Sequence, residues 1–244
     1  MKKIMIVACL LGATAVSAQL NVNTLKKKAA AISKVAPALS EKEVIDGLKE
    51  ALSKGATNAG QLTSAVGGFN GNSLIKIPFP EDAKKMETNL RAAGMGLQVD
   101  KFVTTMNEAA ELASKQVGDI FLTAIKNMTV KDGMNILQGK EDAATTYLNG
   151  QTYQQLYDTF KPIVVQALKQ VEVTKYWNPL MTKYNSIPFV DKVNPDLEDY
   201  TTKKAIEGLF KMVAQEELKI RQNISARTSD LLKKVFGEAD KKRK

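Results

Sequence analysis

The chain has 244 residues and a formal net charge of +9, with no histidine and one cysteine, Cys9. The lack of histidine excludes Ser-His-Asp and Cys-His catalysis and imidazole-ligated zinc. One cysteine cannot form an intramolecular disulfide or a thiolate metal cluster. Apolar residues make up 44% of the chain and charged residues 25%, so the composition is that of a globular protein with a sizeable core.

The first 18 residues have the pattern of a cleaved secretory signal. Lys2 and Lys3 precede an apolar run at 4–16, and small residues favour cleavage between Ala18 and Gln19. The run is shorter than the ~20 residues of a spanning helix, and no later stretch approaches that length. We therefore expect a periplasmic or secreted protein with no transmembrane segment after signal removal.

Residues 6–9 also resemble a lipoprotein processing box that ends at Cys9. The apolar run continues well past this cysteine, whereas a lipoprotein signal would have its apolar region before it. We therefore do not expect lipidation.

The positive charge lies near the ends of the chain. Four lysines fall in a basic leader or linker at 19–39, and a basic C-terminal tail at 238–244 has four bases and two acids. The helical domain between them, 40–237, has 25 bases and 24 acids. A nearly neutral body lacks the basic face of a nucleic-acid-binding domain, so no nucleic acid partner is expected.

The first half of the body has the start and stop signals of helices. Ser40 and Glu43 form a capping box, and the helix that follows is expected to stop at Gly55. The glycine-dense stretch 67–72 predicts a loop. A helix over 80–94 is expected next, with a proline in its first turn.

Longer apolar stripes follow. Apolar residues three or four apart between 97 and 128 predict a core-facing helix that Gly118 can bend. A short capped helix is expected over 129–139. The clearest amphipathic segment is 156–171, where Pro162 predicts a kink or a late helix start.

The last third predicts three more helices: one over 176–184, one that starts at Asn194 or Asp196, and one from near Ser225 to Gly237. No strong alternating strand pattern occurs. The sequence therefore predicts an all-α fold, a compact multi-helix bundle of one domain.

Several segments resemble, in order, a bacterial family known only as domain of unknown function 4197. They are Leu39-Ser40-Glu41-Lys42-Glu43, Gly47-Leu48-Lys49-Glu50-Ala51-Leu52, Ile77-Pro78-Phe79-Pro80, Asp119-Ile120-Phe121-Leu122, Ala124-Ile125, Met128-Thr129 with Asp132, Asp142-Ala143-Ala144-Thr145, Asp199-Tyr200, Gly208-Leu209-Phe210, Ala226-Arg227-Thr228 and the run from Leu231 to Gly237. The resemblance implies an exported, mainly helical protein of one domain. It implies no activity, ligand or catalytic residue.

Two short motifs match known sites only in part. Residues 73–76 have the S-x-x-K pattern of exported penicillin-binding enzymes, but Pro78 disfavours the helix that this pattern needs, and the companion motifs are absent. Residues 194–198 place oxygen ligands as a calcium loop does, but Asp199 replaces its essential glycine. No cofactor or metal is expected.

Neighbouring carboxylates are the remaining candidates for acid–base catalysis on a glycan. The pairs are Glu108 with Glu111, Glu141 with Asp142, and Glu216 with Glu217. Glycosidases place two carboxyls across a cleft, which neighbours on one helix rarely achieve. Lysines or arginines lie near each pair, so solvated helix faces are the favoured interpretation, and no catalytic residue is assigned.

Arg221 and Arg227 precede the last predicted helix and could bind an anion there. The interpretation that we favour is structural, because arginine forks commonly form ion pairs within a fold. Arg227 would then pair with Glu217 or Asp230 and lock the last helix.

Aromatic residues with polar groups gather in one part of the chain. All the tyrosines and the only tryptophan lie there: Tyr147, Tyr153, Tyr157, Tyr176, Trp177, Tyr184 and Tyr200. Such rings suit partner surfaces and sugar-stacking sites. Their helical spacing favours core packing for most of them, while part of the group could border a groove.

These observations lead to one main hypothesis. We expect an exported, non-catalytic helical protein that binds another cell-envelope component, a protein or a glycan, near the Tyr/Trp-rich half. The alternatives are a carboxylate-based enzyme that acts on cell-wall glycans and a carrier that holds an apolar ligand between helices.

Overall fold

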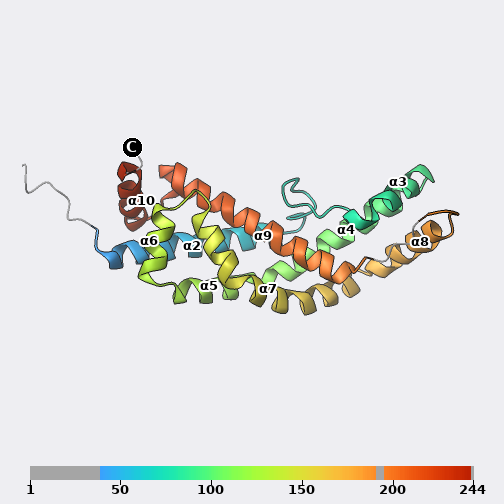
Figure 1. Cartoon of the computed structure of the whole chain (residues 1–244), viewed down its shortest axis with the longest axis horizontal. Helices are drawn as coiled ribbons and strands as arrows, with labels where there is room; N and C mark the ends of the chain where they lie inside the picture. The colour runs from blue at the N-terminus through green and yellow to red at the C-terminus, as the bar shows by residue number, and fades with distance from the viewer. Residues whose placement is uncertain (1–38, 191–194, 243–244) are drawn as a thin grey trace, which may run out of the picture. The chain divides into compact units, whose positions relative to one another are not determined.

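The structure, a computed structural model, describes residues 39–190 and 195–242 (Figure 1). Asn194, the predicted signal, the lipidation motif at Cys9, all of the basic leader except Leu39, and the last two residues of the basic tail lie outside the described residues.

The first described helix, α2 (Glu41–Ser64), begins as predicted and ends later than predicted. The Ser40 hydroxyl accepts a hydrogen bond from the Glu43 amide, and the Glu43 carboxylate accepts one from the Ser40 amide, which completes the capping box. The expected stop at Gly55 is wrong. This glycine is buried inside the helix because α2 crosses α9 there, and a Cβ at its position would lie 3.4 Å from Cβ of Glu216.

The segment after α2 is a series of turns, as its glycines predict. Gly67 has φ of +77°, a conformation that L side chains rarely adopt. The S-x-x-K motif at 73–76 lies in this segment and forms no helix. The 3-10 turn η1 (Glu81–Ala83) and helix α3 (Lys84–Ala92) occupy the place of the predicted helix over 80–94.

The predicted long helix between 97 and 128 is two helices. Helix α4 (Gly96–Ala113) ends in the 3-10 turn η2 (Ser114–Gln116), and α5 (Val117–Asn127) follows. The break therefore precedes the bend expected at Gly118. The short helix after it, α6 (Val130–Gln138), is confirmed, with a capping box formed by Thr129 and Asp132.

Helix α7 (Ala143–Gln170) includes Pro162, so the late start considered at this proline is wrong. Helix α8 (Val173–Asn185) follows directly after Glu172, which has φ of +51°.

Helix α9 (Leu197–Gln222) begins at one of its two predicted caps, since the Asp196 carboxylate accepts a hydrogen bond from the Asp199 amide. A 3-10 turn, η3 (Ile224–Ala226), occupies the predicted start of the last helix. Helix α10 (Asp230–Lys242) continues past the predicted end at Gly237 and includes much of the predicted tail. Ala239 is buried and Asp240 forms an ion pair, so packing extends the helix.

The helices form one all-α bundle, and the described residues include no strand. Helix α9 packs against both α2 and α7, α4 packs against α7 and α8, and α10 packs against α2 (Figure 1). Trp177 packs against Phe79 and Phe102 in the core, with its ring tilted to both of theirs. Within the described ranges, no helix has the length and apolar character needed to cross a membrane.

Candidate functional site

The longest helix pair of the bundle is antiparallel. The Glu217 carboxylate of α9 contacts the start of α7 at Ala144, and Asp199, near the start of α9, contacts Tyr157 of α7. Residue numbers therefore fall along α9 as they rise along α7. This register places two different environments along one helix–helix contact.

At one end of this pair, which we call the closed end, four residues form a buried polar cluster: Ala144, Thr145, Glu217 and Arg221. Glu217 accepts hydrogen bonds from the Ala144 amide at 3.0 Å and from the Thr145 amide and hydroxyl, each at 2.8 Å. Its carboxylate thereby caps the N-terminus of α7, which favours negative charge.

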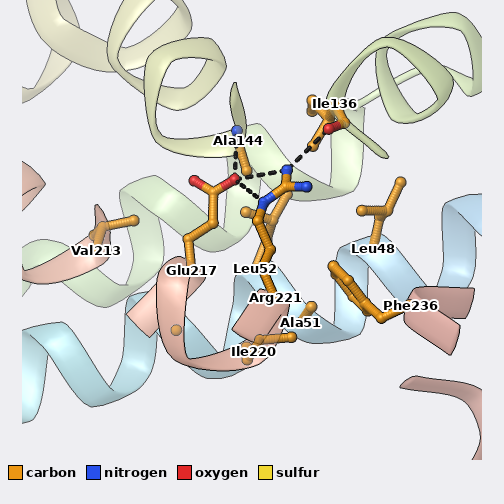
Figure 2. A pocket seen from close by; sticks show the side chains of 11 residues that line it. Leu48, Ala51, Leu52, Ile136, Ala144, Val213, Glu217, Ile220, Arg221 and Phe236 are labelled. Carbon is orange, nitrogen blue, oxygen red and sulfur yellow. Dashed lines mark hydrogen bonds and ion pairs between the residues drawn. The ribbon is translucent and has the colours of Figure 1, made fainter. Parts of the chain in front are cut away.

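Arg221 completes the closed end (Figure 2). Its Nη2 lies 2.8 Å from the Glu217 carboxylate, and the same nitrogen donates to the Ile136 carbonyl at the end of α6. The Arg221 side chain is 2% exposed and that of Glu217 is 6% exposed. The pair therefore joins α6, α7 and α9 and leaves no free charge.

A small cavity of about 20 Å³ lies beside this pair, lined mainly by apolar side chains of α2 and α9 (Figure 2). About 10–15 Å³ holds one water molecule. The cavity is therefore far too small for an apolar ligand of the size that a carrier would hold.

Arg227 is also engaged, though with other partners than predicted. Its guanidinium donates to the carbonyls of Ile220 and Arg221, at the end of α9, and pairs with Asp240 of α10 at 2.7 Å. The expected partners Glu217 and Asp230 are wrong, because Glu217 is held by Arg221 at the closed end. Arg227 nevertheless joins the last helix to α9.

Two further carboxylates are buried, contrary to the solvated helix faces that we predicted. Glu111 is 6% exposed and accepts hydrogen bonds from the amides of Gly67, Phe69 and Asn70, so it holds the glycine-rich loop. Its predicted pair partner, Glu108, is exposed on the surface of α4.

Glu216 is 7% exposed and accepts hydrogen bonds from Asn58 and Lys219. Desolvation raises the pKa of Glu216, but these two hydrogen bonds, together with the positive charges of Lys219 and Lys54, outweigh it and leave the pKa below its usual value. Glu141 and Asp142 are exposed, as expected for a solvated face. No described group of acidic or cysteine side chains could hold a metal ion.

Beyond the closed end, the contact between α7 and α9 opens into a shallow surface groove, which we call the α7–α9 groove. Its lining residues recur every three or four positions on both helices: Asp142, Thr145, Thr146, Asn149 and Tyr153 on the α7 side, and Lys203, Glu207, Phe210, Lys211 and Ala214 on α9. Most of the lining side chains are polar or charged, while carbon atoms form the larger part of the exposed surface of the groove.

Tyr153 is the exposed aromatic residue of this groove. It is 37% exposed, and within the described part of the chain its hydroxyl has no hydrogen-bond partner. The side chains of Asn149 and Thr146, one and two turns before it on α7, likewise have no partner among the described residues. These three groups are available to a ligand.

The charges of the groove balance. Lys211 pairs with Glu207 at 2.8 Å, and Lys203 pairs with Asp199 at 2.9 Å. Hydrogen bonds from Lys204 and Lys211 lower the pKa of Glu207, so this carboxylate is ionised at neutral pH. The groove therefore presents ion pairs and no excess of either sign.

Tyr157, one turn beyond Tyr153, is held by the fold. Its hydroxyl donates to Asp199 at 2.6 Å, and the Lys161 ammonium lies 5.6 Å from the centre of its ring. The hydrogen bond from Tyr157, followed by that from Lys203, lowers the pKa of Asp199. Tyr157 is half-buried.

The structure scatters the other aromatic candidates. Trp177 and Tyr184 are buried, which agrees with the core-packing interpretation, and Tyr176 is half-buried on α8. Tyr147 is half-buried and its hydroxyl lies 3.3 Å from Asp132, while the Tyr200 hydroxyl donates to the Pro78 carbonyl. Of these aromatic candidates, only Tyr153 and Tyr157 lie one turn apart on α7, away from the closed end.

Sequence reasoning missed the polar lining of the groove. Thr146 and Asn149 precede Tyr153 at helical spacing, which is a detectable signal on α7 alone. Lys203 and Lys211 join them only through the antiparallel register of α9, which the sequence does not specify.

Together, the bundle and its groove define an all-helical protein with an open polar surface site. The chain belongs to the family described as protein of unknown function (DUF4197), whose profile matches residues 38–237. This match confirms the resemblance noted in the sequence. No curated protein and no solved structure matches the chain.

Proposed function

We propose that this is an exported, non-catalytic binding protein that docks another component of the cell envelope in the α7–α9 groove. The observation that carries the proposal is the availability of Tyr153, Asn149 and Thr146 in an open groove. Export, to the periplasm or beyond the cell, is proposed from the signal-like pattern at 1–18.

The buried carboxylates support binding over carboxylate catalysis. Glu217 caps α7, Glu216 is held by Asn58 and Lys219, and Glu111 holds a loop. Each is thus used for the fold, and the adjacent pair Glu216 and Glu217 binds different elements instead of facing across a cleft. A glycosidase needs two carboxyls about 5–10 Å apart on either side of its substrate.

The proposal is tested by photo-crosslinking from within the groove. A benzophenone amino acid replaces Asn149 in the full-length protein, and, as a control, replaces the exposed Lys101 of α4. We expect irradiation of intact cells to attach an envelope component at position 149 and not at position 101. Equal products from both positions, or only copies of this chain, would contradict the proposal.

A further inference from the structure

We infer that the occupant of the α7–α9 groove is a neutral, β-linked glycan chain whose sugar ring stacks on Tyr153. The inference rests on the proposed function and specifies its ligand.

The Tyr153 ring is exposed in the groove. It is 37% exposed, and no described cation lies over it, whereas the neighbouring ring of Tyr157 has Lys161 above it. An accessible aromatic face with a polar edge can pack against the apolar face of a pyranose while its hydroxyl bonds a sugar hydroxyl. β-1,4-linked glucose-type sugars have such flat faces, because their substituents are equatorial.

Side chains that can form hydrogen bonds line the groove with this ring. The Asn149 amide offers two donors and one acceptor group, and the Thr146 hydroxyl can both donate and accept. Sugar hydroxyls also donate and accept, so these two side chains match them in either orientation. Both line the same groove as Tyr153.

The charge and the length of the groove also favour a neutral chain. The lining includes Asp142 and Glu207 with Lys203 and Lys211, so its formal charge is zero. A polyanion or polycation gains little Coulomb attraction from such a surface, and a neutral chain does not depend on it. From Asp142 to Tyr153 the α7 side extends about 16 Å at ~1.5 Å per residue, which suits a short oligosaccharide better than a single sugar.

The inference is tested by calorimetric titration of the purified protein with three β-linked tetrasaccharides. Two are neutral, tetra-N-acetylchitotetraose and cellotetraose, and one is an anionic hyaluronan tetrasaccharide. We expect saturable binding of at least one neutral chain, with little dependence on salt, and weaker binding of the anionic chain.

Variants connect this binding to the groove. Tyr153→Ala is expected to weaken binding by about tenfold, equivalent to ~1.4 kcal/mol, because the stacking ring is lost. Tyr153→Phe keeps the ring and should stay within about threefold of the unchanged protein. Tyr157→Phe is the matched control, since it changes a neighbouring tyrosine that is held by Asp199, and it should leave the affinity unchanged.

The possible failures are distinct. If neither neutral tetrasaccharide binds, if the anionic chain binds more tightly, or if Tyr153→Ala has no effect, the inference is overturned. A position-149 crosslink to an envelope protein without glycan binding would support the proposed function and reject the glycan. Glycan binding through Tyr153 without any envelope crosslink would support the glycan site and reject docking in the envelope.

Discussion

At the closed end of the α7–α9 pair, the Glu217 side chain is 6% exposed and its carboxylate accepts hydrogen bonds from Ala144, Thr145 and Arg221. Two to three turns further along α7, Tyr153 is 37% exposed and its hydroxyl has no partner among the described residues. The same two helices therefore use polar side chains in opposite ways. The closed end has its polar groups satisfied within the fold, and the groove leaves some of them available.

Burial explains the difference. A charged group that leaves water must be paired and hydrogen-bonded, or the fold pays a large penalty. An exposed hydroxyl or amide is solvated by water, so it can remain without a protein partner until a ligand binds, with no such penalty. Changes at the closed end should therefore affect stability, and changes at the exposed side chains of the groove, Thr146, Asn149 and Tyr153, should affect binding alone.

The largest effect is expected for Glu217→Ala. The substitution leaves the buried guanidinium of Arg221 without its anion and uncaps α7, which should lower the free energy of unfolding by about 3–5 kcal/mol. Chemical denaturation measures this loss. Glu207→Gln, at an exposed carboxylate of the groove, is the control and should change stability by less than about 0.5 kcal/mol. Similar losses of unfolding free energy for both variants would contradict the distinction between the closed end and the groove.

Glu111 is a second buried carboxylate, and it forms no ion pair within the described residues. It therefore tests the effect of burial without a paired cation. Glu111→Ala leaves the amides of Gly67, Phe69 and Asn70 unpaired. We expect a loss of about 2–3 kcal/mol in unfolding free energy. Hydrogen exchange of these three amides should become faster, while the amides of α7 keep their protection. Unchanged exchange in the loop would show that Glu111 does not hold it.

Gly208 on a packed face of α9 and Gly150 on an open face of α7 allow the effect of an added Cβ on stability to be compared. A Cβ at Gly208 would lie 2.7 Å from the Phe69 ring and 3.2 Å from Cβ of Ile75, whereas a Cβ at Gly150 would meet nothing within 4 Å. Gly208→Ala should destabilise by about 1–2 kcal/mol through overpacking. Gly150→Ala should stabilise by about 0.5–1 kcal/mol, because alanine favours helix. Thermal unfolding distinguishes the two variants. Equal shifts in Tm would contradict the close packing of Gly208 against Phe69 and Ile75.

The smallest effect is expected at Asp199, beyond the groove. Its pKa is lowered in the folded protein by Tyr157 and then Lys203. The ionised carboxylate therefore contributes stability above its unfolded pKa of about 3.9, and this contribution is lost as the pH falls through the folded value. Tyr157→Phe should raise the pKa of Asp199 toward its usual value in an NMR titration. An unchanged pKa would mean that Tyr157 has no influence on it.

Local signals in the sequence were reliable where the chemistry is local. The capping boxes at Ser40 and Thr129 require only residues three apart, and both form as predicted. The predicted helix ends were wrong where packing against distant residues decides them. Gly55 stays helical because α9 covers it, and α10 continues past Gly237 because Asp240 meets Arg227.

The candidate site divides in the same way. The clustering of tyrosines along the chain pointed to this region, but sequence spacing could not separate the exposed Tyr153 from the buried Trp177 and Tyr184. Which side of a helix faces solvent depends on all the helices that pack against it, and that arrangement involves residues far apart in the chain.

The sequence by itself determined an all-helical body, the capping boxes that begin α2 and α6 and its near-neutral charge, because helical periodicity, capping and composition are properties of short segments. Only the tertiary structure decided which charges are buried and which remain free. Glu216 and Glu217 are neighbours in the chain, yet one bonds Asn58 of α2 and the other the start of α7. Partners of this kind lie 70 or more residues away, and only packing of the helices brings them within hydrogen-bonding distance.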